Sequence, residues 1–304
     1  MSEFRFLWLL PLLTVVLAAL SMVIPYIIGA SLRHFPALVP YISDGGATPP
    51  EGHIFSLLLT LSGVLLALTV FIHHRILTAH FRKMSTGATW RRVLSWVAVL
   101  FGWLQAVGMW GAANFDEKRS VAVHRIFAGV LFGGAVVYIW LSTILSLCSI
   151  RLTGLQWVMV RVGIGAIMTT ALAIHQLANI FHIFVTDKNA DIDAYEKEGG
   201  YTIRWLPPTS PFYLNHIMAT TFEWITAITG FAYFLTYIAE FKRTKVTLPR
   251  MIFTVPVHPD TYEGDCVEAA RDKDVVFMTY EHAEGPARGE RNRSINGYQS
   301  TRVT

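Results

Sequence analysis

Residues 54–73 read IFSLLLTLSGVLLALTVFIH and contain no Asp, Glu, Lys or Arg. A helix of about 20 mostly apolar residues is long enough to cross the roughly 30 Å hydrocarbon core of a bilayer. Five other stretches have a comparable length and character: 7–30, 93–113, 122–148, 157–185 and 214–240. The sequence therefore predicts an all-α, polytopic membrane protein with six transmembrane helices.

Composition supports this class. Of the 304 residues, 53% are apolar and only 15% are charged, whereas soluble domains carry about 25% charged residues. The mean hydropathy is +0.43. These values exclude a disordered chain and an ordinary soluble enzyme of this length. A net charge of +4 is too dilute to make a surface that follows nucleic-acid phosphates. We therefore expect membrane lipids, and no nucleic acid, among the partners.

The charged residues divide the chain into two parts. Residues 1–240 hold 27 of the 46 charged side chains, and the much shorter segment 241–304 holds the other 19. This difference predicts a six-helix transmembrane domain over 1–245 and a disordered cytoplasmic tail over 246–304. We expect the tail to be the part of the chain that contacts cytoplasmic protein partners.

Lysine and arginine in the flanks of the apolar stretches predict the orientation, because cytoplasmic flanks carry an excess of them. One side holds eleven: Arg5, Arg75, Arg82, Lys83, Arg91, Arg92, Arg151, Lys242, Arg243, Lys245 and Arg250. The other side holds seven: Arg33, Lys118, Arg119, Arg125, Lys188, Lys197 and Arg204. The first side is therefore predicted to be cytoplasmic, with both termini inside and outer loops at 31–53, 113–121 and 186–213.

Glycines inside the apolar stretches are interpreted as places where helices approach closely, because packing within a membrane favours small residues. These glycines are Gly63, Gly102, Gly108, Gly111, Gly129, Gly133, Gly134, Gly163 and Gly165.

Polar and ionisable residues inside a membrane are costly, so each one is a candidate for function. His175, Asn179 and His182 are spaced to share one helical face, and His216 and Glu223 share a face of the last stretch. With the predicted orientation they occupy the outer half, where they could meet residues of the first outer loop. The candidate outer polar cluster is Asp44, Glu51, Asn114, His124, His175, Asn179, His182, His216 and Glu223. His73 and His74, beside Arg75, are instead interpreted as basic residues at the cytoplasmic interface.

Three hypotheses for this cluster remain open. It is a buried polar network that fixes helix packing, a metal-assisted or acid/base lipid-processing site, or a cavity that binds a lipid, an ion or a small molecule without chemistry. No zinc-protease, nucleophile-elbow, phosphate-loop or dinucleotide-binding pattern occurs in the sequence. We therefore assign no catalytic residue, no metal ligand and no cofactor.

Several ordered motifs resemble the Frag/DRAM/Sfk superfamily of membrane proteins, over about residues 5–245. The first outer loop supplies Ser43-Asp44-Gly45, Pro49-Pro50-Glu51 and Ile54-Phe55. Later motifs are Trp103, Asn114-Phe115, His124, Phe127, Trp205-Leu206-Pro207, Tyr213, His216, Glu223-Trp224 and Glu240-Phe241-Lys242. Many relatives carry a Cys after the Pro-Pro-Glu motif, where this chain has Gly52-His53. That departure argues against a luminal disulfide here.

The resemblance implies a six-helix membrane protein without an established enzymatic reaction. It leads us to expect a non-enzymatic regulator similar to the damage-regulated autophagy modulators, in a lysosomal or other endomembrane or in the plasma membrane. Two alternatives stay open. One is a phosphoinositide-signalling regulator or mechanosensitive channel component of the tentonin-like, plasma-membrane branch. The other is a GPI-anchor or other lipid-remodelling factor with a luminal polar site.

Overall fold

The computed structural model describes residues 3–4, 6–83, 88–192, 205–244 and 246–247. Residues Glu3–Val246 form one compact unit. The predicted boundary of the membrane domain near residue 245 and the predicted disordered tail stay predictions. All of the tail except residues 246–247 lies outside the described part of the chain.

Among the described residues, six helices are long and apolar enough to cross a membrane. They are α1 (Leu9–Ser31), α2 (Glu51–Lys83), α3 (Ala88–Asn114), α4 (Val121–Cys148), α6 (Leu155–Phe181) and α8 (Tyr213–Leu235). The predicted all-α, six-span membrane class is therefore confirmed. The orientation of the two termini stays a prediction.

Shorter elements lie between and beside these helices. The 3-10 helix η1 (Ile42–Gly46) lies in the loop between α1 and α2, which is the predicted first outer loop. The helices α5 (Ile150–Thr153) and α9 (Ile238–Lys242) are one turn long or slightly more. The strands β1 (Glu3–Phe4) and β2 (Val246–Thr247) form a two-stranded sheet. Two strands of two residues each do not change the all-helical class.

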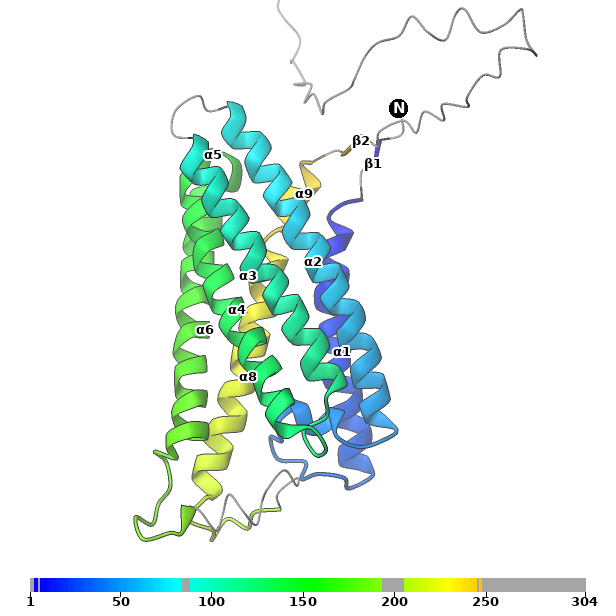
Figure 1. Cartoon of the computed structure of the whole chain (residues 1–304), viewed down its shortest axis with the longest axis vertical. Coiled ribbons are helices and arrows are strands. Elements are labelled where there is room, and N and C mark those ends of the chain that lie inside the picture. The colour runs from blue at the N-terminus through cyan, green and yellow to red at the C-terminus, as the bar shows by residue number, and fades with distance from the viewer. Residues whose placement is uncertain (1–2, 5, 84–87, 193–204, 245, 248–304) are drawn as a thin grey trace, which may run out of the picture. The chain divides into compact units, whose positions relative to one another are not determined.

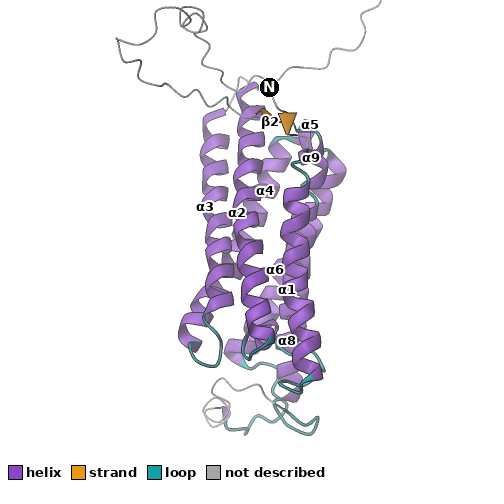
Figure 2. Ribbon diagram, turned by 90° about the vertical axis from the view of Figure 1, so that its right-hand side faces the viewer, coloured by secondary structure: helices purple, strands orange, loops and turns teal. Residues whose placement is uncertain are grey.

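The long helices lie side by side in a bundle, and each packs on the next along the chain (Figures 1 and 2). The contacts of α1 with α2, α2 with α3, α3 with α4 and α6 with α8 are the most extensive. The return contact of α8 with α1 closes the bundle but is much lighter. The α4–α6 contact is also light, so the bundle has two less extensive junctions, α4–α6 and α8–α1.

Backbone geometry explains where some of these helices begin and end. Glu51 opens α2, where its acidic side chain suits the positive end of the helix dipole. Gly154 has φ +89° between α5 and α6, a conformation that favours glycine. His182 adopts the left-handed conformation, with φ +49°, and ends α6. The last predicted stretch is likewise divided, because α8 ends at Leu235 and α9 begins at Ile238.

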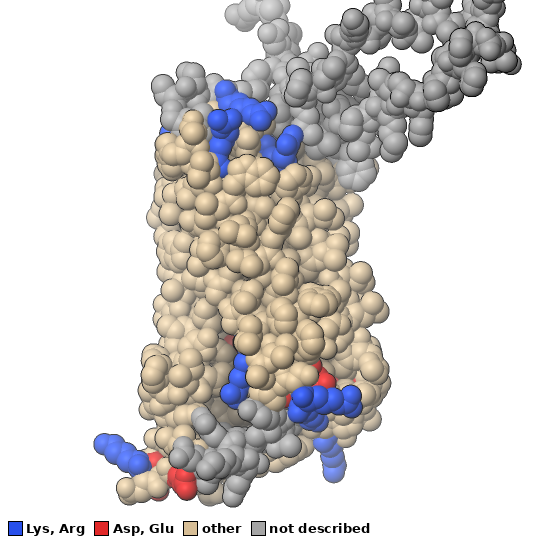
Figure 3. All heavy atoms as spheres, viewed as in Figure 1, with Lys and Arg blue, Asp and Glu red and all other residues tan. Residues whose placement is uncertain are grey.

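The outer surface of the bundle is suited to lipid. Large apolar side chains are well exposed on several helices, for example Leu57, Ile126 and Leu155 at 60–64%. A broad band of the face drawn in Figure 3 carries no charged residue, and charged residues gather towards its two ends. At the end that carries α5 and α9, this face shows only Lys and Arg, whereas acids accompany the bases at the opposite end. A continuous apolar band of this extent marks contact with a membrane.

Two glycines allow α3 and α4 to approach closely, as predicted. A Cβ atom at Gly108 would lie 2.4 Å from the backbone nitrogen of Leu131, and one at Gly111 would lie 2.0 Å from the ring of Phe127. The close-packing interpretation is wrong for three other glycines, where nothing lies within 4 Å of the Cβ position: Gly129, Gly133 and Gly163.

Candidate functional site

The first outer loop is held against α8 by hydrogen bonds from two adjacent residues of that helix. Oε2 of Glu223 accepts the backbone N–H of Ile42 at 2.9 Å. Nε1 of Trp224 donates to the carbonyl oxygen of Pro40, also at 2.9 Å. Glu223 is 7% exposed, so its carboxyl group lies inside the bundle rather than in solvent. The loop is therefore fixed to a membrane helix rather than only to its own flanks.

Asp44 is buried at the same place. It is 5% exposed, and its Oδ2 accepts the backbone N–H of Tyr41 at 2.9 Å. Burial raises the pKa of Asp44 well above its ordinary value, and the nearby carboxylate of Glu117 adds to this shift. The Tyr41 N–H and the charge of Lys118 act in the opposite direction but do not outweigh the burial. The loop thus holds a carboxyl group that resists ionisation.

A chain of hydrogen bonds connects the loop to α6. The hydroxyl of Tyr41 donates to Oδ1 of Asn179 at 2.8 Å, and Nδ2 of Asn179 lies 3.2 Å from Nε2 of His175. Nδ1 of His175 lies 2.8 Å from the carbonyl oxygen of Ala219 on α8. A neutral His175 with its proton on Nδ1 satisfies both contacts, because Nδ1 then donates and Nε2 accepts. The chain links η1, α6 and α8.

His216 contacts this chain at Tyr41, and His182 makes a separate contact with Asn215. The ring of His216 stands edge-on to the ring of Tyr41, with 5.3 Å between centroids. Nδ1 of His182 lies 3.4 Å from Nδ2 of Asn215, which also donates to the carbonyl oxygen of Ala178 at 3.0 Å. Asn215 therefore joins α8 to the end of α6, a role that sequence reasoning missed.

The remaining candidates make separate contacts. Glu51 is fully buried and its Oε1 pairs with Nδ1 of His34. Nδ2 of Asn114 donates to Oγ1 of Thr60 at 2.9 Å, which joins α3 to α2. Nδ1 of His124 lies 2.8 Å from the carbonyl oxygen of Phe115.

The structure thus brings together around Tyr41 and Ile42 the side chains of Asp44, His175, Asn179, His216 and Glu223. We call this set of seven residues the loop anchor. The structure places Glu51, Asn114, His124 and His182 at neighbouring but distinct contacts. No group of three or more His, Cys, Asp or Glu side chains in the described ranges is placed to hold a metal ion.

A second polar cluster, which sequence reasoning missed, lies at the opposite end of the bundle. Nη1 of Arg161 is 3.0 Å from Oε1 of Glu240, and Nε2 of His73 is 3.0 Å from Oε2 of the same carboxylate. All three side chains are at most 3% exposed. This triad joins α6, α9 and α2, and each oxygen of the carboxylate has its own partner.

Hydroxyl groups surround the triad. Nε of Arg161 donates to Oγ1 of Thr236 at 2.8 Å, and Nη1 donates to Oγ of Ser146 at 2.6 Å. The guanidinium also lies over the ring of Tyr237, 4.7 Å from its centroid. The hydroxyl of Tyr237 in turn contacts that of Tyr138 at 2.8 Å. A buried arginine is tolerated here because nearly every donor meets an acceptor or a ring face.

The interpretation of His73 and His74 as interfacial residues is therefore wrong. They are 2% and 3% exposed, and Nδ1 of His74 lies 2.8 Å from Oγ of Ser95. The predicted stretch ends at residue 73, but α2 continues to Lys83 and carries both histidines into the bundle. Arg161, a charge inside a predicted span, was the available signal for a buried partner.

Comparison with known proteins identifies the family of this chain. The profile of the Frag1/DRAM/Sfk1/Cwh43P N-terminal domain matches residues 6–244. The chain belongs to this family. The matched range contains all six long helices, the loop anchor and the Arg161–Glu240–His73 triad, so both polar clusters are part of the Frag1/DRAM/Sfk1 domain.

Relatives extend over most of the chain. DNA damage-regulated autophagy modulator protein 1 of Mus musculus is 28% identical over 233 residues, which cover 76% of this chain and 90% of that protein. DNA damage-regulated autophagy modulator protein 2 of Homo sapiens is 27% identical over 237 residues, 77% of this chain and 84% of that protein. Transmembrane protein 150A of Homo sapiens is 29% identical over 108 residues, 36% of this chain and 37% of that protein. No solved structure is significantly similar.

Proposed function

We propose that this integral membrane protein is a non-enzymatic regulator of autophagy that acts in a lysosomal or related endomembrane. The observation that carries the proposal is the extent of its similarity to the damage-regulated autophagy modulators. Two of these proteins align over 84–90% of their own length. Transmembrane protein 150A aligns over only 37% of its length.

The polar clusters support a regulator rather than a catalyst. At the loop anchor, the side chains of His175, Asn179 and Glu223 each bond a neighbouring element of the bundle. Groups that are occupied in this way stabilise a single arrangement of helices and loop. We infer that the fixed outer loop and the apolar outer wall present a defined surface to lipids and to other membrane proteins.

Autophagic degradation in cells that lack the protein tests this proposal. The rate is measured as the part of long-lived protein degradation that a lysosomal inhibitor blocks, before and after DNA damage. We expect the damage-induced increase to be lost in the deleted cells and restored by the wild-type chain. A tagged chain should coincide with lysosomal markers rather than with plasma-membrane markers.

A matched control uses Gly129→Ala, because nothing lies within 4 Å of the new Cβ atom and the fold is left intact. This variant should restore degradation as well as wild type. An unchanged increase in the deleted cells, together with plasma-membrane localisation, would contradict the proposal and favour the tentonin-like alternative.

A further inference from the structure

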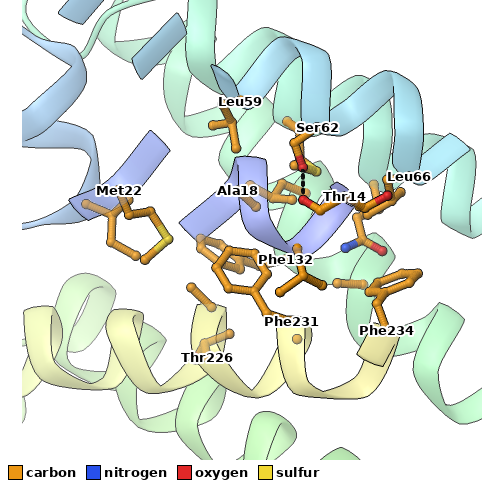
Figure 4. Close-up of a pocket in the computed structure, with 18 of the residues that line it drawn as sticks. Thr14, Ala18, Met22, Leu59, Ser62, Leu66, Phe132, Thr226, Phe231 and Phe234 are labelled. Atoms are coloured by element: carbon orange, nitrogen blue, oxygen red, sulfur yellow. Dashed lines mark hydrogen bonds between the residues drawn. The ribbon is translucent and has the colours of Figure 1, made fainter. Parts of the chain in front are cut away.

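A cavity lies within the bundle, with residues of α1 and α8 on opposite sides of it (Figure 4). Its lining is almost entirely apolar, and none of the described residues that line it is charged. The hydroxyl groups of Thr14, Ser62 and Thr226 in this lining each donate to a backbone carbonyl of the bundle. A charged ligand therefore finds its partners not in this cavity but at the ends of the bundle, where Lys and Arg gather (Figure 3).

Four arginines lie near the end of α2 and near the start of α3, and we call them the arginine cluster: Arg75, Arg82, Arg91 and Arg92. Arg75 and Arg82 are exposed, and Arg91 and Arg92 are partly buried. None of the ion pairs formed among the described residues involves any of the four. On the face drawn in Figure 3, this end of the bundle shows Lys and Arg but no acidic residue. The cluster therefore carries positive charge that no described acid neutralises.

Arg91 shows how closely the start of α3 lies against the end of α2. Its guanidinium carbon lies 5.7 Å from the ring centroid of Phe81 on α2 and 5.4 Å from that of Trp90. A cation is attracted to ring faces, which favours this position of the guanidinium. Phe81 directly precedes Arg82 in α2. Arg91 and Arg82 therefore lie at the same level of the α2–α3 junction.

Helical spacing turns Arg92 towards α2 as well. Trp96 follows Arg92 by four residues, so the two side chains share one face of α3. The ring of Trp96 lies 4.2 Å, between centroids, from the ring of His74 on α2. The face of α3 that carries Arg92 is therefore the face that packs on α2.

The two arginines of α2 lie on the side of that helix that meets α3. Phe71 of α2 packs against Trp103 of α3, with 6.3 Å between ring centroids. Arg75 follows Phe71 by four residues and Arg82 follows Arg75 by seven, spacings that keep all three on one face. All four arginines thus lie along the α2–α3 junction rather than spread around the bundle.

The start of α3 also favours an anion. Ala88 begins the helix, and its first turn contains no acidic residue. The N-terminal end of a helix carries partial positive charge, so the charges of Arg91 and Arg92 are unfavourable there, and a bound anion relieves this repulsion. Trp90 is 49% exposed, and an exposed tryptophan at the end of a membrane helix marks the level of the lipid headgroups. The arginine cluster thus lies at the depth of the lipid phosphates.

We propose that the arginine cluster binds an anionic phospholipid whose headgroup ends in a phosphate monoester. Groups of four or more Lys or Arg beside a membrane helix attract anionic headgroups. The planar fork of a guanidinium donates two parallel hydrogen bonds to phosphate oxygens. A monoester offers three such oxygens and up to about two negative charges, so it can accept from several of these arginines at once. The inference goes beyond the proposed role in autophagy and does not depend on it.

Native mass spectrometry tests the binding. The full-length protein in a neutral detergent is titrated with dioctanoyl phosphatidic acid, which is a phosphate monoester, and with dioctanoyl phosphatidylglycerol, which is a diester with the same chains. We expect phosphatidic acid to bind at about tenfold lower concentration, the effect of one additional charge-assisted hydrogen bond. Glycerol phosphate, the soluble headgroup, should compete only weakly, because it lacks the chains that hold the lipid against the bundle.

Two double variants separate this site from the general charge of the same end. Arg82→Gln/Arg92→Gln should weaken the binding of phosphatidic acid by about 30-fold, the combined effect of two arginines near a membrane surface. Arg151→Gln/Arg243→Gln removes the same charge from exposed positions at α5 and at the end of α9, and should leave the preference for phosphatidic acid intact. Thermal unfolding in detergent verifies that each variant is folded.

A conservative variant decides if Arg82→Gln/Arg92→Gln does not fold. Arg82→Lys/Arg92→Lys keeps both charges but loses both forks, so the preference over phosphatidylglycerol should fall several-fold. Equal binding of the two lipids by the wild type, equal losses in the two glutamine variants, or an unchanged preference in the lysine variant would each overturn the proposal. So would displacement by glycerol phosphate at the same concentration as the lipid, which would indicate a site for soluble phosphate.

Discussion

The carboxyl group of Glu223 accepts a hydrogen bond from the backbone N–H of Ile42 at 2.9 Å, across 181 positions of sequence. Ile42 belongs to the first outer loop and Glu223 to the last long helix. Trp224 holds Pro40 by a second bond next to the first. The loop that follows the first long helix is thus bonded to the last long helix, although the sequence alone would place this loop at the surface.

Removing this acceptor should destabilise the fold. Glu223→Leu leaves the Ile42 N–H buried without a partner, which costs about 1–3 kcal/mol. Glu223→Gln keeps an acceptor oxygen and should cost less. Thermal unfolding of the purified variants in detergent measures the difference. Equal unfolding temperatures for the two variants would show that the bond contributes nothing.

Breaking the Arg161–Glu240 pair should destabilise the fold more than breaking the Glu223–Ile42 hydrogen bond does. Arg161→Leu leaves the Glu240 carboxylate buried with only one strong partner, a change that costs about 3–5 kcal/mol in comparable buried pairs. Arg151→Leu, at an exposed position near the same end, should cost little. The double variant Arg161→Leu/Glu240→Leu should be less unstable than the sum of the two single variants. Additive losses in unfolding experiments would contradict this pairing.

The raised pKa of Asp44 predicts that the stability of the fold depends on pH. Its pKa in the folded protein is raised above the ordinary value of 3.8, chiefly by burial. The folded state therefore binds this proton more tightly than the unfolded state does. The resulting stabilisation is complete below the unfolded pKa and is lost as pH rises through the folded pKa.

As the pH is lowered from 7.5 to 4, protonation of Asp44 should therefore raise the unfolding temperature. Asp44→Asn, which keeps an acceptor for the Tyr41 N–H, should flatten the profile. Glu117→Gln should flatten it only in part, because Glu117 is the smaller of the two causes that raise the pKa. The neighbouring Lys118 and Glu223 stay unchanged in both variants. An Asp44→Asn profile parallel to that of the wild type would refute this role.

The α3–α4 contact provides a packing test. Gly108→Ala would place a Cβ atom 2.4 Å from the backbone of Leu131, so one helix must shift. We expect the free energy of unfolding to fall by about 1–3 kcal/mol, the usual cost of overpacking. Gly129→Ala meets open space and should be neutral or stabilising by up to about 1 kcal/mol, because alanine favours helix. If both variants unfold at the same temperature, these two helices are not in close contact.

The fold class was predictable because hydrophobic runs of membrane length have few other uses. The six spans follow the predicted stretches closely, although α2 extends to Lys83 and the last stretch is divided between α8 and α9. Polar residues such as Glu223 and His175 were identifiable because a membrane makes them costly. Helical spacing placed them on faces but gave no partner across the bundle.

The side-chain contact partners of these residues could not be predicted from the sequence. They depend on which faces of helices distant in sequence lie against one another. Glu240 meets both Arg161 and His73 only in the folded bundle. Glycine shows the same limit, since Gly108 faces a helix and Gly133 faces open space. Oε1 of Gln105 is buried without a hydrogen-bond partner among the described residues, and this too is visible only in the folded bundle.

Autophagic degradation in deleted cells that express Glu223 variants tests most directly whether the anchored outer loop serves the proposed regulatory function. The variants are compared at equal abundance in the same membrane. Wild type and Glu223→Gln should restore the damage-induced rise in lysosomal degradation, and Glu223→Leu should not. Full restoration by Glu223→Leu at wild-type abundance would contradict the proposed link between the loop anchor and autophagy.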